Sequence, residues 1–187
     1  MTTELLNAPL IVVSGASGSG KTTLCQLVAQ RLGFHYAISH TTRPKREGEV
    51  EGVNYYFIDK QHFDQMIKEG DFLEWAVVYD NCYGTSKKTL FDYINQGQGV
   101  IVDVDTQGAK SIKEKIPSAV TVFIQPPSFE ELKRRLIARK TDSPEVLQKR
   151  LNQAAHEESQ KGSYDHVIIN DDIQRAYSEL EDIIKKC

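Results

Sequence analysis

Short runs of consecutive apolar residues recur at four places along the chain. They are rich in Val and Ile and lie at 10–14, 100–104, 120–124 and 166–170. Because side chains along a strand alternate between the two faces of a sheet, an unbroken apolar run predicts a strand that is buried on both faces. Strands of this kind are typical of a parallel sheet covered by helices on each side.

The segments between these runs carry the 3.6-residue period of amphipathic helices. Their apolar stripes contain Leu24, Leu27, Val28 and Leu32, then Leu90 and Ile94, and near the C-terminus Ile173, Ala176, Tyr177, Leu180, Ile183 and Ile184. Two further helices are predicted to begin at Ser128, where a Glu follows three positions later, and at Ser143, which precedes a proline. We expect Phe129, Leu132 and Leu136 of the first to face inward. Strands that alternate with helices predict an α/β fold with right-handed crossovers.

Two segments interrupt this alternation. Residues 39–83 are rich in Gly, Tyr and charge, and they contain one predicted strand at 54–58 and one short predicted helix near 62–68. Residues 133–150 carry seven Lys and Arg side chains against two acidic ones. Because insertions between core strands commonly form accessory lobes on the ligand side of a sheet, we expect each segment to be such a lobe.

Composition and charge exclude several function classes. The 187 residues have a net charge of −3, which does not favour nucleic acid or an anionic membrane as the main partner. Three cysteines without a CxxC pair do not indicate a disulfide framework or a structural zinc site. No apolar run approaches the roughly 18 residues of a membrane span, and residues 1–7 lack the basic and apolar regions of a signal peptide. We therefore predict a soluble cytoplasmic protein that binds neither nucleic acid nor membrane.

The first candidate site follows the first predicted strand directly. Residues 15–22 read GASGSGKT, the pattern G-x-x-x-x-G-K-T, and an apolar helical stripe follows them. A strand, a glycine loop and a helix in this order are the context of a P-loop, whose backbone N–H groups bind the phosphates of a nucleoside triphosphate. Lys21 would contact the β- and γ-phosphates, and Thr22 would coordinate Mg²⁺. The loop alone does not say which group receives the phosphate.

A carboxylate at the end of another predicted strand would complete this arrangement. Asp103 lies at the end of an apolar run, where an acidic side chain can contribute to the Mg²⁺ coordination shell. Asp105 lies two positions later, so we expect its side chain to face the same crevice. Considered alone, Asp103 could instead be an acidic residue that caps a strand end.

A second candidate site lies in the 39–83 insertion. Arg43 and Arg46 precede a group of tyrosines, and guanidinium groups bind phosphate through paired hydrogen bonds. Considered alone, the segment could equally be a solvated basic loop. It is followed in order by GDFLEWA at 70–76, YGTS at 83–86 and DVDTQG at 103–108.

Taken together, these segments closely resemble the guanylate kinase family, whose members phosphorylate GMP to GDP with ATP. The resemblance extends from about Leu10 to the C-terminal helix. It implies an α/β P-loop three-layer fold with a parallel five-stranded core sheet. It also implies a discontinuous core of residues 1–38, 84–126 and 160–187, a small mixed α+β GMP-binding lobe at 39–83 and a helical lid at 127–159.

The resemblance implies a role for each matching residue. The ATP site would comprise Gly15, Ala16, Ser17, Gly18, Ser19, Gly20, Lys21, Thr22, Thr23, Arg135, Asn170 and Asp171, with the last two at the adenine. The GMP phosphate would be bound by Arg43, Arg46, Tyr55 and Tyr83, and the guanine by Ser39, Glu74, Thr85 and Asp105. The catalytic cations would be Lys21, Arg46, Arg139 and Arg150, with Mg²⁺ bound by Thr22 and Asp103 as the cofactor. ATP and GMP would be the substrates, and dGMP is expected as a second acceptor.

The chemistry of guanine supports the role of Glu74 independently. Guanine presents N1–H and its exocyclic amine side by side, and one carboxylate can accept both hydrogen bonds. Adenine presents a lone pair at N1, which would leave a buried carboxylate facing an acceptor at a cost of about 1–3 kcal/mol. Without the neighbouring motifs, Glu74 could instead be a surface acid.

The expected mechanism needs no general base, because a phosphate monoester with a second pKa of about 6 is already an anion at neutral pH. Catalysis would consist of positioning and charge neutralisation, with lid arginines closing over the transferred group and excluding water. Two alternatives stay open. One is a P-loop kinase for another small phosphorylated acceptor, such as a sugar phosphate. The other is a guanylate-kinase-like module that binds proteins without catalysis, which the intact P-loop disfavours. The sequence does not predict the oligomeric state.

Overall fold

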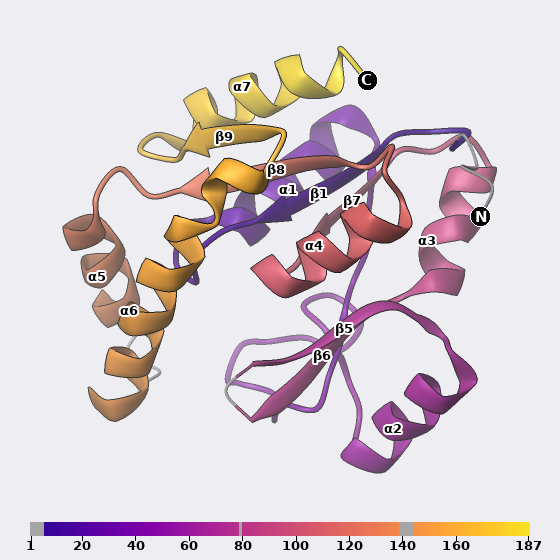
Figure 1. The fold of residues 1–187 in the computed structure, drawn as a ribbon, viewed down its shortest axis with the longest axis horizontal. Coiled ribbons are helices and arrows are strands. Elements are labelled where there is room, and N and C mark those ends of the chain that lie inside the picture. The colour runs from indigo at the N-terminus through magenta and orange to yellow at the C-terminus, as the bar shows by residue number, and fades with distance from the viewer. Residues whose placement is uncertain (1–5, 79, 139–143) are drawn as a thin grey trace.

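A parallel sheet in the order β2-β7-β1-β8-β9 forms the core of the protein (Figure 1). The structure is a computed structural model that describes residues 6–78, 80–138 and 144–187. The strands of the sheet are β1 (Leu10–Ser14), β2 (His35–Tyr36), β7 (Val100–Asp103), β8 (Val120–Gln125) and β9 (His166–Ile169). The predicted five-stranded parallel sheet is confirmed. Four strands coincide with the apolar runs, but β9 lies at the edge of the sheet with only Ile168 buried, so the prediction that its run is buried on both faces is wrong. Strand β2 has two residues, too few to produce a pattern.

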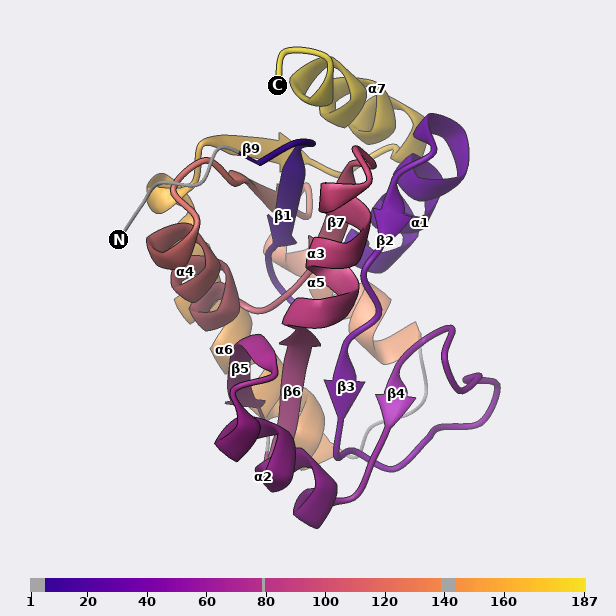
Figure 2. The same cartoon turned by 90° about the vertical axis from the view of Figure 1, so that its right-hand side faces the viewer.

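Helices cover both faces of this sheet and make three layers. On one face, α3 (Lys87–Asn95) and α4 (Thr106–Lys115) pack on Leu10 and Val12. On the other, α1 (Lys21–Leu32) and α7 (Ile173–Ile184) pack on Ile11 and Val13. Figure 2 shows α4 and α1 on opposite sides of β1. Because successive residues of β1 belong to different cores, all five are buried, which explains the unbroken apolar run.

A second, four-stranded sheet lies beside the core in the order β4-β3-β6-β5. Its elements are β3 (His40–Thr41), β4 (Tyr56–Phe57), β5 (Phe72–Val78) and β6 (Asn81–Ser86), with α2 (Lys60–Glu69) packed against them. Phe63, Phe72 and Cys82 form an apolar cluster separate from the cores of the large sheet. The predicted strand at 54–58 and helix near 62–68 coincide with β4 and α2, whereas the pattern does not predict β3, β5 or β6.

Two helices, α5 (Phe129–Ala138) and α6 (Pro144–Ser159), project from the other end of the core and are followed by a 3₁₀ turn, η1 (Lys161–Ser163). Ser128 Oγ accepts a hydrogen bond from the Glu131 backbone N–H at 3.1 Å, so the predicted N-cap is confirmed. Leu132 and Leu136 are buried, but Phe129 is 42% exposed, and the prediction that it faces inward is wrong. The apolar cluster begins only at Leu132, nearly one turn further along the helix. Within the described ranges, no helix has the length and apolar character that crossing a bilayer requires.

Candidate functional site

A cavity of about 370 Å³ opens where the P-loop, the four-stranded sheet and α6 meet. It gathers side chains from all three parts of the molecule, and most of the predicted site residues line it. These are Gly15, Ser17, Gly18, Gly20, Lys21, Thr22, Thr23, Ser39, Arg43, Arg46, Tyr55, Glu74, Tyr83, Asp103, Asp105 and Arg150. The structure therefore brings the two candidate sites of the sequence together in one cavity.

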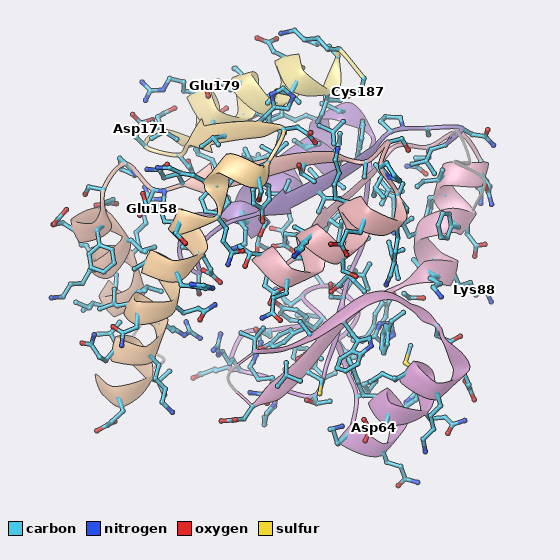
Figure 3. All side chains as sticks on the ribbon, viewed as in Figure 1. Asp64, Lys88, Glu158, Asp171, Glu179 and Cys187 are labelled. Atoms are coloured by element: carbon cyan, nitrogen blue, oxygen red, sulfur yellow. The ribbon has the colours of Figure 1, made fainter. Side chains whose placement is uncertain are left out.

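Within the described ranges, six predicted residues are not in the cavity lining: Ala16, Ser19, Thr85, Arg135, Asn170 and Asp171. Arg139, which was also predicted, lies outside the described residues. Ala16, Ser19 and Thr85 are buried. Asp171 follows β9 at an exposed position, distant from the four-stranded sheet (Figure 3).

The P-loop is held by contacts on both of its sides. On the cavity side, Lys21 Nζ donates hydrogen bonds to the carbonyl oxygens of Gly15 at 2.5 Å and Ala16 at 3.0 Å. On the other side, Asn170 Nδ2 donates to the Ser19 carbonyl oxygen at 2.8 Å. Gly20 has a φ of +94°, and a Cβ there would lie 2.2 Å from Asn170 Nδ2, so both conformation and space require glycine.

Arg135 of α5 contacts Asn170 as well. Its guanidinium donates to Glu131 at 2.8 Å and to the Asn170 carbonyl oxygen at 3.0 Å. The Asn170 side chain is thus engaged with the P-loop, and its backbone is engaged with α5. Arg135 and Asn170 thus connect α5, the end of β9 and the P-loop.

Asp103 at the end of β7 accepts a hydrogen bond on each of its carboxylate oxygens. Thr22 Oγ1 donates to Oδ2 at 2.6 Å, and Tyr36 OH donates to Oδ1 at 2.7 Å. A hydroxyl and a carboxylate are oxygen ligands of the kind that Mg²⁺ prefers, and this ion commonly binds through one or two carboxylates together with substrate phosphates. Thr22 and Asp103 therefore fit the predicted cation. Nowhere in the described part of the chain do three or more His, Cys, Asp or Glu side chains form a metal-binding group.

Glu49, which the sequence did not predict as a site residue, organises the loop that carries Arg43 and Arg46 (the arginine loop, residues 43–49). Glu49 accepts a hydrogen bond from Arg43 at 2.6 Å and one from the backbone N–H of Arg46 at 2.7 Å. The Arg43 guanidinium lies 5.5 Å from the centre of the Tyr55 ring, and the Tyr55 and Tyr83 rings are 5.8 Å apart. Cationic and hydroxyl groups thus converge on one side of the cavity, as an anion-binding site requires.

Glu74 on β5 is a buried carboxyl group that faces the cavity, with only 4% of the residue exposed. Thr85 Oγ1 donates to Glu74 Oε1 at 2.6 Å and lies 3.4 Å from Ser39 Oγ. Burial raises the pKa of Glu74 to about 7, with the Asp105 carboxylate acting in the same direction and the Thr85 hydroxyl against it. When ionised, this carboxylate can accept two adjacent N–H groups from a ligand.

The turn after β7 completes this corner of the cavity. Asp105 caps α4 by accepting a hydrogen bond from the Gly108 backbone N–H at 2.7 Å, and burial raises the pKa of its carboxyl. A Cβ at position 108 would lie 2.7 Å from Glu74 Oε2. Gly108 therefore leaves the space that the Glu74 side chain occupies.

Helix α6 contributes two buried charged residues to the cavity. Arg150 and Glu157 are each 7% exposed and line the cavity seven positions apart, which places them on the same face of the helix. Burial raises the pKa of Glu157, while Lys21 acts in the opposite direction. An arginine and an acid from α6 thus share the cavity with the P-loop lysine.

Comparison with known proteins decides the family. The model of the family described as guanylate kinase matches residues 7–187. The guanylate kinase of Symbiobacterium thermophilum is 49% identical over 176 residues, which are 94% of this chain and 83% of that protein. The chain belongs to the guanylate kinase family. The guanylate kinase of Carboxydothermus hydrogenoformans is 48% identical, over 94% of this chain and 86% of that one.

Solved structures agree with the guanylate kinase family at the level of the fold. The guanylate kinase from Anaplasma phagocytophilum superposes with a TM-score of 0.80 at 33% identity, covering 97% of this chain and 86% of that one. The shikimate kinase from Bacteroides thetaiotaomicron, at 13% identity and a TM-score of 0.50, shares the fold.

The resemblance to guanylate kinases left four charged or polar residues of the cavity unassigned. They are Tyr36, Glu49, Asn54 and Glu157. Glu49 could have been predicted from the sequence, because an acid three positions after Arg46 is well placed to form an ion pair with an arginine of the same loop. Tyr36 lies in a two-residue strand, and Glu157 lies in a helix with many other polar residues, so neither stands out in the sequence.

Proposed function

We propose that this chain transfers the γ-phosphoryl group of ATP to GMP, forming ADP and GDP, in the cavity between the P-loop and the four-stranded sheet. Membership of the guanylate kinase family supports this reaction. The observation that carries the choice of acceptor is the buried Glu74 carboxyl, which lines the same cavity as Arg43 and Arg46. One pocket can therefore bind a base with two adjacent donors and the phosphate attached to that nucleoside.

The donor nucleotide would bind at the P-loop. The phosphates of ATP would accept hydrogen bonds from the loop N–H groups and from Lys21, replacing the Gly15 and Ala16 carbonyl oxygens as partners of its ammonium group. Asn170 would support this loop from behind through Ser19. Arg135 would complete the ATP site, and Asp171 remains the candidate for contact with adenine.

Mg²⁺ would be held by Thr22 and Asp103, the two oxygen-bearing side chains that hydrogen-bond to each other beside the P-loop. When bound, the ion would neutralise negative charge on the β- and γ-phosphoryl oxygens. Tyr36 would hold the second oxygen of Asp103 throughout.

The acceptor would bind on the opposite side of the cavity. Its phosphate would lie among Arg43, Arg46, Tyr55 and Tyr83, with Glu49 keeping the arginine loop in position. Its guanine would lie against Glu74, Thr85, Ser39 and Asp105. Glu74 would accept from guanine N1–H and the amine, and a hydroxyl of Ser39 or Thr85 would donate to O6.

Catalysis would rest on alignment and on charge. The acceptor oxygen is already anionic, so no side chain needs to remove a proton from it. Arg46 would hold the acceptor phosphate in line with the γ-phosphate, while Arg150 from α6 neutralises charge on the transferred group. Arg139 is proposed for the same task on resemblance alone.

The proposed roles divide the chain into three parts. Residues 1–38, 84–126 and 160–187 would form the ATP-binding core, residues 39–83 the GMP-binding lobe and residues 127–159 the lid. Cytoplasmic location and the absence of nucleic-acid partners stay predictions.

A coupled assay with ATP and Mg²⁺ tests the proposal by comparing GMP, dGMP, AMP and UMP as acceptors. We expect the highest kcat/KM with GMP. A better acceptor outside the guanine nucleotides would instead favour a kinase for another phosphorylated substrate. No turnover with any acceptor, from a folded protein that still binds GMP, would favour the binding module.

A further inference from the structure

The Tyr36 hydroxyl makes a contact that packing of the core does not require. Its ring packs against the apolar cluster under α1 and α7, where a phenylalanine would serve as well. Its hydroxyl nevertheless reaches Asp103 Oδ1 at 2.7 Å and lies in the lining of the nucleotide cavity. The polar atom of this otherwise apolar side chain is thus directed at one carboxylate.

Backbone pairing fixes where this hydroxyl lies. Tyr36 of β2 pairs with Ile101 of the neighbouring strand β7, two residues before Asp103. The Ala37 N–H donates to the Ile101 carbonyl oxygen at 2.9 Å, so the backbone that carries the tyrosine is tied to β7 on both sides of this pair. A side chain anchored in this way can restrict the rotation of Asp103.

The two hydroxyls that contact Asp103 differ in what they can do. Thr22 lies on the P-loop side and is itself a candidate cation ligand, whereas Tyr36 comes from the edge of the sheet. A phenol has an ordinary pKa of about 10, so at neutral pH the Tyr36 hydroxyl carries its proton and donates to Oδ1.

We propose that Tyr36 is a positioning residue for the cation site: its hydroxyl binds Asp103 Oδ1 and thereby keeps Oδ2 beside Thr22, ready to share in binding Mg²⁺ with ATP. This inference rests on the proposed function, in which Thr22 and Asp103 hold the ion. Outer hydrogen-bond partners of ligating groups commonly contribute about 10- to 100-fold to metal affinity, so the removal of one hydroxyl is measurable.

Calorimetry of nucleotide binding tests the inference without turnover. The dissociation constant of a non-hydrolysable ATP analogue is measured with excess Mg²⁺ and again with EDTA. The value in EDTA divided by the value with Mg²⁺ is the ratio that isolates the contribution of the cation. For Tyr36→Phe we expect this ratio to shrink about tenfold while the affinity in EDTA stays near the wild-type value. A merely structural role would weaken binding in both conditions alike, and that result would overturn the inference.

Tyr177→Phe is the matched control, because Tyr177 packs in the same apolar cluster but its hydroxyl lies 3.3 Å from Glu181, on α7. It should leave the ratio unchanged. Asp103→Asn should reduce the ratio. The double variant, which carries Asp103→Asn and Tyr36→Phe, should reduce it no further, because the tyrosine acts through the carboxylate. Additive losses would overturn the inference.

The variants also separate failure of the inference from failure of the proposed function. If Asp103→Asn reduces the ratio and Tyr36→Phe does not, the cation site stands and the role of Tyr36 is wrong. If Asp103→Asn itself leaves the ratio unchanged, the cation site at Thr22 and Asp103 is wrong, and the inference falls with it.

Discussion

Lys21 has a proposed role in the reaction and no visible role in the packing of the fold. Its ammonium contacts two loop carbonyls and points into the cavity rather than into an apolar core. Lys21→Met should therefore leave the melting temperature within a few degrees of the wild type. Turnover should fall on the order of 10²-fold or more, because the γ-phosphate loses its cation. Steady-state kinetics and thermal unfolding measure both effects.

Lys88→Met is the matched control for this variant, since Lys88 is an exposed lysine of α3 (Figure 3). It should keep full turnover. A folded Lys21→Met protein with turnover close to that of the control would contradict the assignment of the P-loop.

Glu74→Gln tests base recognition. The amide places an N–H donor opposite a donor of guanine, so kcat/KM for GMP should fall by about 1–3 kcal/mol, which is about 5- to 150-fold. The KM for ATP should stay nearly constant because the triphosphate binds across the cavity. Relative use of IMP and AMP should improve. If kcat/KM for GMP changed less than about twofold, Glu74 would not contact the base.

The raised pKa of Glu74 also predicts a pH dependence of stability. Between its ordinary value of 4.5 and its folded value of about 7, the folded chain holds a proton that the unfolded chain has lost. The contribution of this residue to the free energy of unfolding is therefore greatest below pH 4.5 and declines as the pH rises through about 7. Glu74→Gln does not titrate, so its melting temperature relative to the wild type should rise between pH 5 and pH 8. A constant difference across that range would show that the carboxyl is not titrating near neutrality.

At the scale of elements, the end of β9 supports the P-loop through Asn170. Asn170→Ala would leave the Ser19 carbonyl oxygen without its side-chain donor, lowering the free energy of unfolding by about 1–3 kcal/mol. The KM for ATP should rise more than the KM for GMP, since the loop that loses its support is the donor site. Kinetics with each substrate varied in turn measure the difference. Glu179→Ala, at an exposed position of α7 (Figure 3), should leave stability and the KM for ATP unchanged, and equal losses in the two variants would contradict the role of Asn170.

The elements also explain how much of the fold was predictable. The central strands β1, β7 and β8 are buried on both faces, so their unbroken apolar runs identify them. Strand β2 is too short for any period, and β5 mixes buried Glu74 with exposed Trp75 because one of its faces lines the cavity. Patterns of apolar residues report burial in a core, and they fail where a strand is shaped by a ligand site.

The candidate site was also predictable only in part. The glycine loop and the arginines were predictable because phosphate binding demands those residue types at those spacings. Glu49 and Tyr36 act by holding other site residues, Arg43 and Asp103, and such roles depend on contacts between segments distant in sequence. Only the folded chain shows which of its many acids and tyrosines lie at those places.

At the scale of the whole molecule, the cavity depends on α6 as well as on the core and the four-stranded sheet. Arg150 of α6 brings a buried positive charge to the lining that also contains Lys21. Arg150→Ala should lower kcat on the order of 10²- to 10³-fold, by analogy with arginine side chains that stabilise phosphoryl transfer, while the KM for GMP changes little. Lys149→Ala removes an exposed neighbouring charge and should retain full activity. Similar kcat losses in both variants would mean that only the overall charge of the lid matters.

The methyl group of Ala16 belongs to the P-loop, yet it packs in the apolar cluster of α5 and α6 with Leu132, Leu136 and Leu151. Any motion that separates these helices from the loop must expose part of that cluster to water. Exposure of apolar surface carries a positive change in heat capacity. A catalytic step limited by such a motion would therefore give a curved Arrhenius plot, and its apparent activation enthalpy would increase with temperature.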